Sequence, residues 1–374
     1  MPGDPSRVHY PQDDSPLCCC EYFDRHGNRN HVLGLLCACD DLDGAADSLL
    51  RGSAPGRDQI DQILAEIDDR LRVPFPGGAW HVGVSGSVPW FLLPFMLIIG
   101  GLSLRCLVIA AALMIPSLLW WHRRALKMRK RTSFLYAWML ASLSFESLLY
   151  YFALARQRPS WHDTSTMAFG IPLLSTIIFL LLVKRADPSS CAGVADAESA
   201  TARSVRCAVS GIKVPRYDHY CAWVDEPVGS SNHRAYVLFV WSMLCTCLIG
   251  AYQMYDANQI RFGWTWSVAW STNGSTMLVS FALYGIAVGL AVMALLVHQV
   301  MVIVSGSTAY EARRKVAPAS GGGWWEHVQS FERQTATLSA TVVAAWVGRK
   351  EMVEEEGVSE GDALPLVDGG VKAT

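Results

Sequence analysis

The sequence predicts an all-α protein that crosses a membrane several times. Of its 374 residues, 51% are hydrophobic and only 17% are charged, a balance that a single water-soluble domain does not show. Five apolar runs approach or exceed the roughly 20 residues that a helix needs to cross a bilayer. The net charge of -2 gives no general attraction to nucleic acid, because the basic residues stand in short clusters beside the apolar runs.

The apolar runs predict six membrane-spanning helices. The first run, residues 88–121, is interrupted by Arg105 just after Gly100 and Gly101. An Arg at the centre of a span costs about 2.5–3.5 kcal/mol, whereas an Arg at a turn costs little, so we expect a hairpin of two short spans. One long span with a central Arg is the alternative. The other spans are predicted at residues 134–154, 167–183, 235–255 and 276–304.

A basic segment predicts the orientation of these spans. Residues 122–131 (HRRALKMRKR) carry six Lys or Arg at a membrane edge, and short basic loops stay in the cytosol. Counting spans from this loop puts both termini in the cytosol and the glycosylation pattern that begins at Asn273 in the lumen. We expect an endomembrane location, in the Golgi or endoplasmic reticulum rather than the plasma membrane.

Three cytosolic parts surround the membrane segments. The spans fill residues 88–183 and 235–304, and the cytosolic parts are a Cys-rich N-terminal region, a loop and a tail, at residues 1–87, 184–234 and 305–374. An amphipathic helix is predicted over residues 58–71, as the core face of a small domain rather than a membrane-bound helix, because its polar face is acidic. The acidic, Gly-containing tail from Glu351 onward is typical of disorder.

Glu146 lies inside the third predicted span. An intramembrane carboxylate is a candidate functional group, since burying it in lipid is costly. A packed, hydrogen-bonded Glu that faces a neighbouring helix fits the sequence equally well, and both interpretations stay open.

The loop of residues 184–234 contains the stretch with the clearest chemistry. Asp218, His219 and Cys221 lie within four residues and are followed by Trp223. A thiol of ordinary pKa is mostly protonated at pH 7, so a nucleophilic Cys needs a base or a cation beside it. His219 suits that role if Asp218 holds its tautomer, as in a nucleophile, base and orienting triad. A polar loop with one buried Cys is the alternative that these residues alone leave open.

Three ordered motifs resemble the DHHC protein S-acyltransferases. The family pattern is Asp-His-His-Cys-Pro-Trp, then Asn-Cys-Val-Gly, then Asn and an aromatic residue; here it is DHYCAW at 218–223, EPVG at 226–229, Asn232 and Tyr236. An Asp-Pro-Gly motif before the loop and a Thr-Thr-x-Glu motif after the last span correspond to DPS at 187–189 and TAYE at 308–311. The motif residues expected to be structural are Asp187, Pro188, Asn232, Thr308 and Glu311.

The resemblance implies an enzyme that transfers a long-chain acyl group from acyl-CoA to protein cysteines near the bilayer. Cys221 is then the nucleophile and acyl carrier, His219 the general base, and Asp218 the residue that orients His219. Trp223 is expected to bind substrate by packing beside the thioester. The implied partners are palmitoyl-CoA, membrane-associated substrate proteins and lipid, with no nucleic acid. Residues 16–43, followed by residues 61–79, further resemble the six-span subgroup described as partners of neuronal nitric oxide synthase.

The loop departs from the family at its zinc-binding positions. The family holds two zinc ions there, each on three Cys and one His. Aligned on Asp218, these positions fall on Gly193, Asp196, Arg206, Lys213, Cys207, Ser210, Tyr220 and Pro227, of which only Cys207 is a usual ligand. Structural zinc needs four ligands, and Cys191 and His233 stand at the wrong spacing to substitute. We therefore expect no zinc in the loop and no required cofactor.

The catalytic set is kept although the scaffold has changed. In the family the first His acts with Asp and Cys and the second binds zinc; here these are His219 and Tyr220. Family members with Tyr at the second position are regarded as active, so this change does not by itself imply a dead enzyme. A membrane adaptor descended from such an enzyme is the alternative. A transporter is not favoured, because the spans show no internal repeat.

The N-terminal thiols are a separate candidate metal site. Its candidate ligands are Cys18, Cys19, Cys20, His31, Cys37 and Cys39. Adjacent cysteines fit a single tetrahedral zinc site poorly, and cysteines near a membrane can be acylated instead. Zinc binding, acylation and plain structural thiols all stay open.

Overall fold

The computed structural model describes residues 21–23, 29–31, 50–51, 68–75, 78–128, 133–153, 164–262, 273–315 and 323–342. The chain divides into two compact units, Met1–Leu92 and Leu93–Thr374. The N-terminal cysteines, most of the predicted amphipathic helix at 58–71 and the acidic tail from Glu351 lie outside the described residues. The structure therefore does not test the predictions made for these segments.

The described part of the first unit contains two antiparallel ribbons. Strand β1 (Glu21–Phe23) pairs with β2 (Arg29–His31), and β3 (Arg72–Phe75) pairs with β4 (Gly78–His81). After β4, Gly83 adopts a φ of +70°, and a Cβ there would meet the Asp68 carboxylate at 3.1 Å. The same carboxylate accepts a hydrogen bond from the backbone N–H of Val84, the first residue of helix α3.

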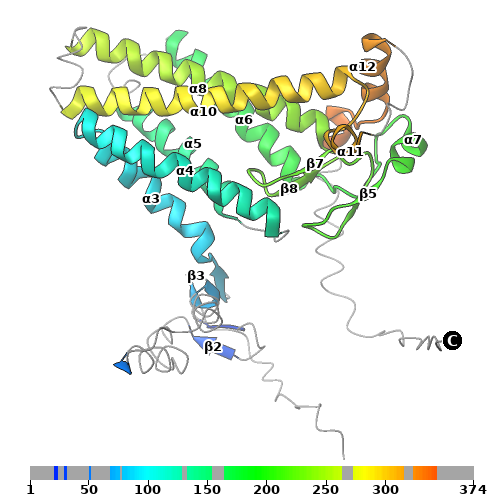
Figure 1. The fold of residues 1–374 in the computed structure, drawn as a ribbon, viewed down its shortest axis with the longest axis horizontal. Coiled ribbons are helices and arrows are strands. Elements are labelled where there is room, and N and C mark those ends of the chain that lie inside the picture. Colours follow the sequence, from blue (N-terminus) through cyan, green and yellow to red (C-terminus); the bar gives the residue numbers. More distant parts are fainter. Residues whose placement is uncertain are drawn as a thin grey trace, which may run out of the picture. The chain divides into compact units, whose positions relative to one another are not determined.

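Long helices make up most of the described part of the second unit. They are α3 (Val84–Gly100, which begins in the first unit), α4 (Leu104–Met128), α5 (Phe134–Ala153), α6 (Thr164–Arg185), α8 (His233–Phe262) and α10 (Asn273–Val304). Helix α8 packs along α10 and against α6 (Figure 1). Helix α3 ends at Gly100 and α4 begins at Leu104, so the helix is interrupted where the hairpin turn is predicted. A Cβ added at Gly101, in this turn, would come within 3.2 Å of the Met277 backbone.

Within the described residues, four helices are long and apolar enough to cross a membrane, which makes this chain a multi-pass membrane protein. The qualifying segments are Leu104–Arg123, Thr164–Arg185, His233–Ile260 and Ser275–Val304. Their outer faces carry large apolar side chains with no cover in the structure, as lipid-facing helices do: Ile109 is 59% exposed and Leu290 65%. Helix α3 is apolar but shorter, and α5 interrupts its apolar run with Glu146.

Glu146 faces the packed interior of the helices. It is buried, and its carboxylate would lie 3.7 Å from a Cβ built at Gly285 of α10. Nearby, the hydroxyl of Tyr284 accepts from Trp138 Nε1 at 3.0 Å and is hydrogen-bonded to Ser142 Oγ at 2.7 Å. This placement favours the interpretation of Glu146 as a packed residue of the helix bundle.

The prediction of an all-α protein is wrong for the loop between α6 and α8. The loop forms helix α7 (Ala197–Ala202) and two antiparallel ribbons, β5 (Val205–Arg206) with β6 (Lys213–Val214) and β7 (His219–Cys221) with β8 (Glu226–Val228). This polar stretch is too irregular for a long helix, and ribbons let its backbone groups pair with each other. After α10 come α11 (Ala309–Arg314) and α12 (Trp324–Arg333).

Candidate active site

Strand β7 presents the two candidate catalytic side chains, His219 and Cys221, on one face. Successive residues of a strand point to opposite sides, so His219 and Cys221 share a face and Tyr220 points away from it. Opposite them on β8, His219 pairs with Val228 and Cys221 with Glu226. The tight turn between the strands places Asp225 at a φ of +54°.

Asp218 is a fully buried carboxylate that receives three hydrogen bonds. His219 Nδ1 lies 2.7 Å and Gln299 Nε2 3.2 Å from Oδ2, while the backbone N–H of Ala309 donates to Oδ1 at 2.7 Å. Burial alone would raise the pKa of Asp218. The hydrogen bond and charge of His219 and the hydrogen bond from the Ala309 N–H outweigh it and hold this pKa well below its usual range. Asp218 is therefore a fixed negative charge behind His219.

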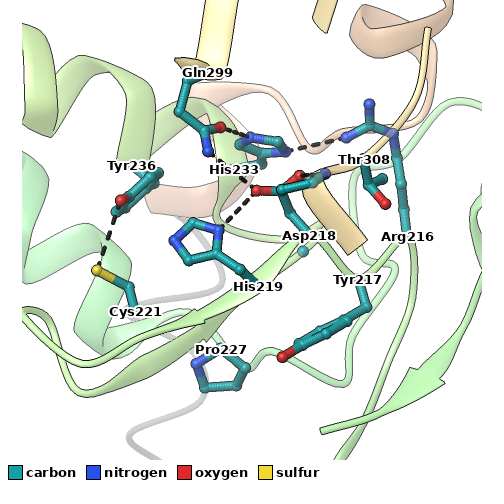
Figure 2. A network of polar contacts seen from close by, with 12 residues as sticks. Arg216, Tyr217, Asp218, His219, Cys221, Pro227, His233, Tyr236, Gln299 and Thr308 are labelled. Carbon is teal, nitrogen blue, oxygen red and sulfur yellow. Dashed lines mark hydrogen bonds and ion pairs between the residues drawn. The ribbon is translucent and has the colours of Figure 1, made fainter. Parts of the chain in front are cut away.

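His219 and Cys221 form a coupled pair in front of that charge (Figure 2). Burial disfavours an imidazolium, but the hydrogen bonds and charges of Asp218 and Cys221 raise the pKa of His219 to about 10. Burial likewise disfavours a thiolate, but the hydrogen bond and charge of His219 outweigh it and lower the pKa of Cys221. Because Asp218 binds Nδ1, Nε2 is the nitrogen left to face the sulfur. Each group of the pair thus favours the charged form of the other.

A second row of polar groups holds Asp218 from behind. Arg216 Nη1 donates to His233 Nδ1 at 3.1 Å, His233 Nε2 donates to Gln299 Oε1 at 2.8 Å, and Gln299 Nε2 donates to Asp218. In this series of hydrogen bonds each residue donates to the next, so His233 accepts at Nδ1 and carries its proton on Nε2. Figure 2 shows these side chains converging on Asp218. The sequence did not reveal these three roles, although Gln299 is polar within an apolar run, which is a usable signal.

The predicted structural motif residues build the walls of this site. Thr308 and Glu311 form a capping box at α11, with Thr308 Oγ1 accepting from Glu311 N at 3.2 Å and Glu311 accepting from Thr308 N at 2.7 Å. This cap aims the Ala309 N–H at Asp218. Asn232 accepts from Gly229 N and donates to the Pro227 carbonyl, both at 3.0 Å, which closes the turn from β8 into α8.

The other predicted residues lie at the edges of the loop. Asp187 follows the end of α6, where its carboxylate accepts from the Ser189 backbone N–H at 2.9 Å, and Pro188 lies in the turn between them. Trp223 is half-buried beside the apolar core, and its ring stacks on His122 of α4 at 6.3 Å. No hydrogen bond described for these three residues joins them to Asp218, His219 or Cys221.

The zinc-binding positions of the family do not form a metal site here. Among the described residues, no three His, Cys, Asp or Glu side chains lie close enough to hold a metal ion. Cys207 instead accepts a hydrogen bond from the Tyr217 hydroxyl at 3.8 Å, and the Tyr220 hydroxyl donates to Asp225. Both ring nitrogens of His233 are engaged by Arg216 and Gln299. The residues present therefore do not fit zinc.

A segment after α11 binds the loop at several points; we call residues 323–342 the C-terminal strap. Its contacts with the loop and the start of α8 are Arg333 O with Asp196 N (2.9 Å), Gln334 with Ser199 (2.7 Å) and Arg203 (2.7 Å), Thr335 with Arg234 (2.8 Å), Ala336 N with Ser230 O (2.8 Å) and Thr341 with Ser231 O (3.1 Å). Ala336 and Ala340 also pack on Val194 and Ala200 in a small apolar cluster. The strap thus connects both ends of the loop.

Comparison with known proteins identifies the family. Residues 197–316 match the family model for the DHHC palmitoyltransferase. The palmitoyltransferase ZDHHC23-B of Danio rerio is 30% identical over 300 residues, covering 63% of this chain and 69% of that protein. ZDHHC23 of Homo sapiens is 27% identical over 301 residues, covering 63% and 73%. These relatives fit the subgroup that residues 16–43 resemble. The chain belongs to the DHHC palmitoyltransferase family.

Proposed function

We propose that Cys221 is the nucleophile and acyl carrier of this enzyme. The chain is a protein S-palmitoyltransferase, as its family and curated relatives indicate. The observation that supports the role of Cys221 is its pairing with His219, whose other ring nitrogen is bound to a buried carboxylate at 2.7 Å. A buried cysteine with only a structural role needs no such pair.

The proposed reaction has two steps. The Cys221 thiolate attacks the thioester carbonyl of palmitoyl-CoA, the new carbon–sulfur bond forms, and the CoA sulfur leaves with the proton of the His219 imidazolium. Neutral His219 then takes the proton of an acceptor cysteine, whose sulfur attacks the acyl-enzyme and releases the Cys221 thiolate. His219 therefore acts as an acid in the first step and as a general base toward the acceptor cysteine in the second, whereas the sequence predicted it as the base that deprotonates Cys221.

The surroundings of Cys221 suit a long acyl chain at a membrane surface. Cys221 belongs to the same apolar cluster as Leu180 of α6 and Phe239 and Leu244 of α8. A chain attached to the sulfur can therefore continue among the spans, while the polar loop receives CoA and a protein cysteine. Trp223, half-buried at the edge of this cluster, is proposed to pack beside the thioester.

Six spans are proposed, with α3 and α5 added to the four apolar helices. A partly buried α5 can tolerate Glu146 because that side chain faces other helices rather than lipid. With six spans, the basic segment after α4, the loop of residues 184–234 and both termini share the cytosolic side. The proposed location is an endomembrane.

We also propose that the loop needs no zinc, because the C-terminal strap holds it instead. Two of the former zinc positions contact the strap directly. The backbone N–H of Asp196 donates to the Arg333 carbonyl at 2.9 Å, and a Cβ at Gly193 would lie 2.1 Å from the Cβ of Ala340. Hydrogen bonds and packing across the loop then supply the connection that a metal supplies elsewhere in the family.

Transfer through Cys221 can be followed on the purified full-length protein in lipid nanodiscs. With alkyne-tagged palmitoyl-CoA, we expect a hydroxylamine-sensitive label on the peptide that contains Cys221, mapped by mass spectrometry. Adding a membrane-anchored cysteine peptide should move this label to the peptide. A membrane adaptor gives no label at Cys221, and label restricted to other cysteines contradicts the proposed function.

Gly193→Ala is expected to lower the thermal stability of the loop more than Gly211→Ala. Both glycines have similar φ values, +71° and +73°, so both substitutions carry the same left-handed strain of about 1–2 kcal/mol. Only position 193 adds a clash with the strap, whereas nothing lies within 4 Å of a Cβ at 211. Overpacking of this kind costs a further ~1–3 kcal/mol. The measurement is the temperature at which half of the Cys221 labelling is lost.

Treatment with a metal chelator tests separately whether the loop depends on zinc. Labelling of Cys221 and its temperature profile should stay within twofold after treatment with EDTA, since no zinc is proposed in the loop. If Gly193→Ala and Gly211→Ala lower the temperature of half-maximal labelling equally, the contact with the strap does not stabilise the loop and this part of the proposal is wrong. A chelator that abolishes labelling would show that the loop depends on a metal.

A further inference from the structure

Tyr236 brings a hydroxyl group to the sulfur of Cys221. It lies in the first turn of α8, where its N–H donates to the Asn232 carbonyl at 2.9 Å, and its side chain is fully buried. Its Oη donates to Cys221 Sγ at 3.6 Å, the dashed contact at the left of Figure 2. The ring also meets the His219 ring edge-to-face, with centroids 5.2 Å apart. Tyr236 therefore contacts both members of the reactive pair.

The hydroxyl is not needed for packing. The family pattern asks only for an aromatic residue at this position, and a Phe ring would fill the same space against Phe239, whose ring lies 6.4 Å away. A buried phenol, in contrast, must find a hydrogen-bond partner or lose stability. In this chain the hydrogen bond described for the Tyr236 hydroxyl is to the reactive sulfur.

We propose that Tyr236 is a further catalytic residue, whose hydroxyl donates to the Cys221 sulfur whenever that sulfur carries negative charge. This inference rests on the proposed role of Cys221. A donor to a thiolate stabilises the anion more than the neutral thiol, because hydrogen bonds to charged acceptors are the stronger ones. Tyr236 and His219 then hold the thiolate from two sides, one from α8 and one from β7.

The other charged groups around Cys221 do not supply this stabilisation. Asp218 is negative and acts through His219. Across the ribbon, Glu226 faces Cys221, but its carboxylate is paired with Lys184 Nζ at 2.9 Å. Burial raises the pKa of Cys221, but this is outweighed by groups that favour the thiolate, among them the hydrogen bonds from His219 and Tyr236, so the pKa is lowered.

The hydrogen bond from Tyr236 to the Cys221 sulfur assists each half-reaction in a different way. In the first, the thiolate is the nucleophile: its S–C bond forms and the CoA sulfur departs with the His219 proton. In the second, the acceptor sulfur forms its bond to the acyl carbon and the Cys221 sulfur departs as a thiolate, to which Tyr236 again donates. Tyr236 thus raises the thiolate fraction in the first step and stabilises the leaving group in the second.

Tyr236→Phe tests the thiol directly, without acyl-CoA. The rate of alkylation of Cys221 by iodoacetamide is measured against pH on the full-length protein, by mass spectrometry of the Cys221 peptide. We expect the midpoint to rise by about one pH unit, since one charge-assisted hydrogen bond is lost. Tyr220→Phe is the matched control, because its hydroxyl lies on the opposite face of β7 and donates to Asp225; its midpoint should not move.

The acyl-transfer rates supply the second readout. In Tyr236→Phe, acylation of Cys221 should fall by up to about tenfold at pH values below the wild-type alkylation midpoint and recover above the shifted midpoint, where the thiolate forms without help. Transfer to an acceptor should stay slow at every pH, because the leaving sulfur still lacks its donor. An unchanged alkylation midpoint, or losses that are the same at every pH in both steps, would overturn the inference. Failure of the proposed function looks different: wild-type Cys221 then carries no acyl group at all.

Discussion

Cys221→Ser is expected to remove the hydroxylamine-sensitive acyl group from the Cys221 peptide altogether. The His219 and Asp218 arrangement stabilises a thiolate, whereas a serine hydroxyl stays protonated at neutral pH and is a far weaker nucleophile. Removing the nucleophile of a comparable catalytic set costs on the order of 10⁶ in rate, so the loss should exceed the range of the assay. An acyl chain transferred to Ser would form an oxygen ester that resists neutral hydroxylamine.

The matched control for this substitution is Cys191→Ser in the same loop. Cys191 is half-buried, and its sulfur lies 3.5 Å from the hydroxyl of Thr201, a contact that a serine can keep. Labelling of Cys221 should persist in this variant. The label must be assigned peptide by peptide, because other cysteines near the membrane can accept an acyl chain. Undiminished transfer of the acyl group to the acceptor peptide by Cys221→Ser would place the nucleophile elsewhere.

The sequence predicted the helices well where apolar composition determines them. The runs 134–154 and 276–304 correspond to Phe134–Ala153 and Asn273–Val304. The run 235–255 corresponds to the longer helix His233–Phe262, which continues past the apolar run through polar residues such as Asp256, Asn258 and Gln259. The β-ribbons escaped prediction, since strands of two to four residues carry no detectable period.

The candidate site likewise combines residues that the sequence could predict with contacts that only the folded structure shows. Asp218, His219 and Cys221 are neighbours in sequence, so their spacing could be recognised from the residues alone. Gln299 and Ala309 contact Asp218 across 81 and 91 residues, and only the packing of α8 against α10 brings such positions together. The strap could not be foreseen either, because its hydrogen bonds with the loop and the start of α8 join residues 98 or more positions apart in the sequence.

Asp218→Asn is expected to lower acylation of Cys221 by about 10³–10⁴-fold, the scale seen when the buried Asp of a serine protease triad becomes Asn. Three donors, from His219, Gln299 and Ala309, converge on this carboxylate. An Asn offers one oxygen and turns an NH₂ group toward at least one of them. If that NH₂ donates to Nδ1, the ring proton moves to Nε2, and neutral His219 faces Cys221 without the charge that holds a thiolate.

The pH dependence of this variant separates the proposed role from a general loss of structure. Without the carboxylate, the pKa of His219 should fall from about 10 toward its ordinary value, and that of Cys221 should rise as its cation is lost. The remaining acylation should therefore shift to higher pH, because more alkaline conditions are needed to form the thiolate. Asp196→Asn is the control: its side chain accepts from Ser199 N at 3.1 Å at the start of α7, and Asn caps a helix equally well. Acylation in Asp218→Asn within tenfold of the wild type, or reduced with an unchanged pH profile, would mean that Asp218 only supports the fold of the loop.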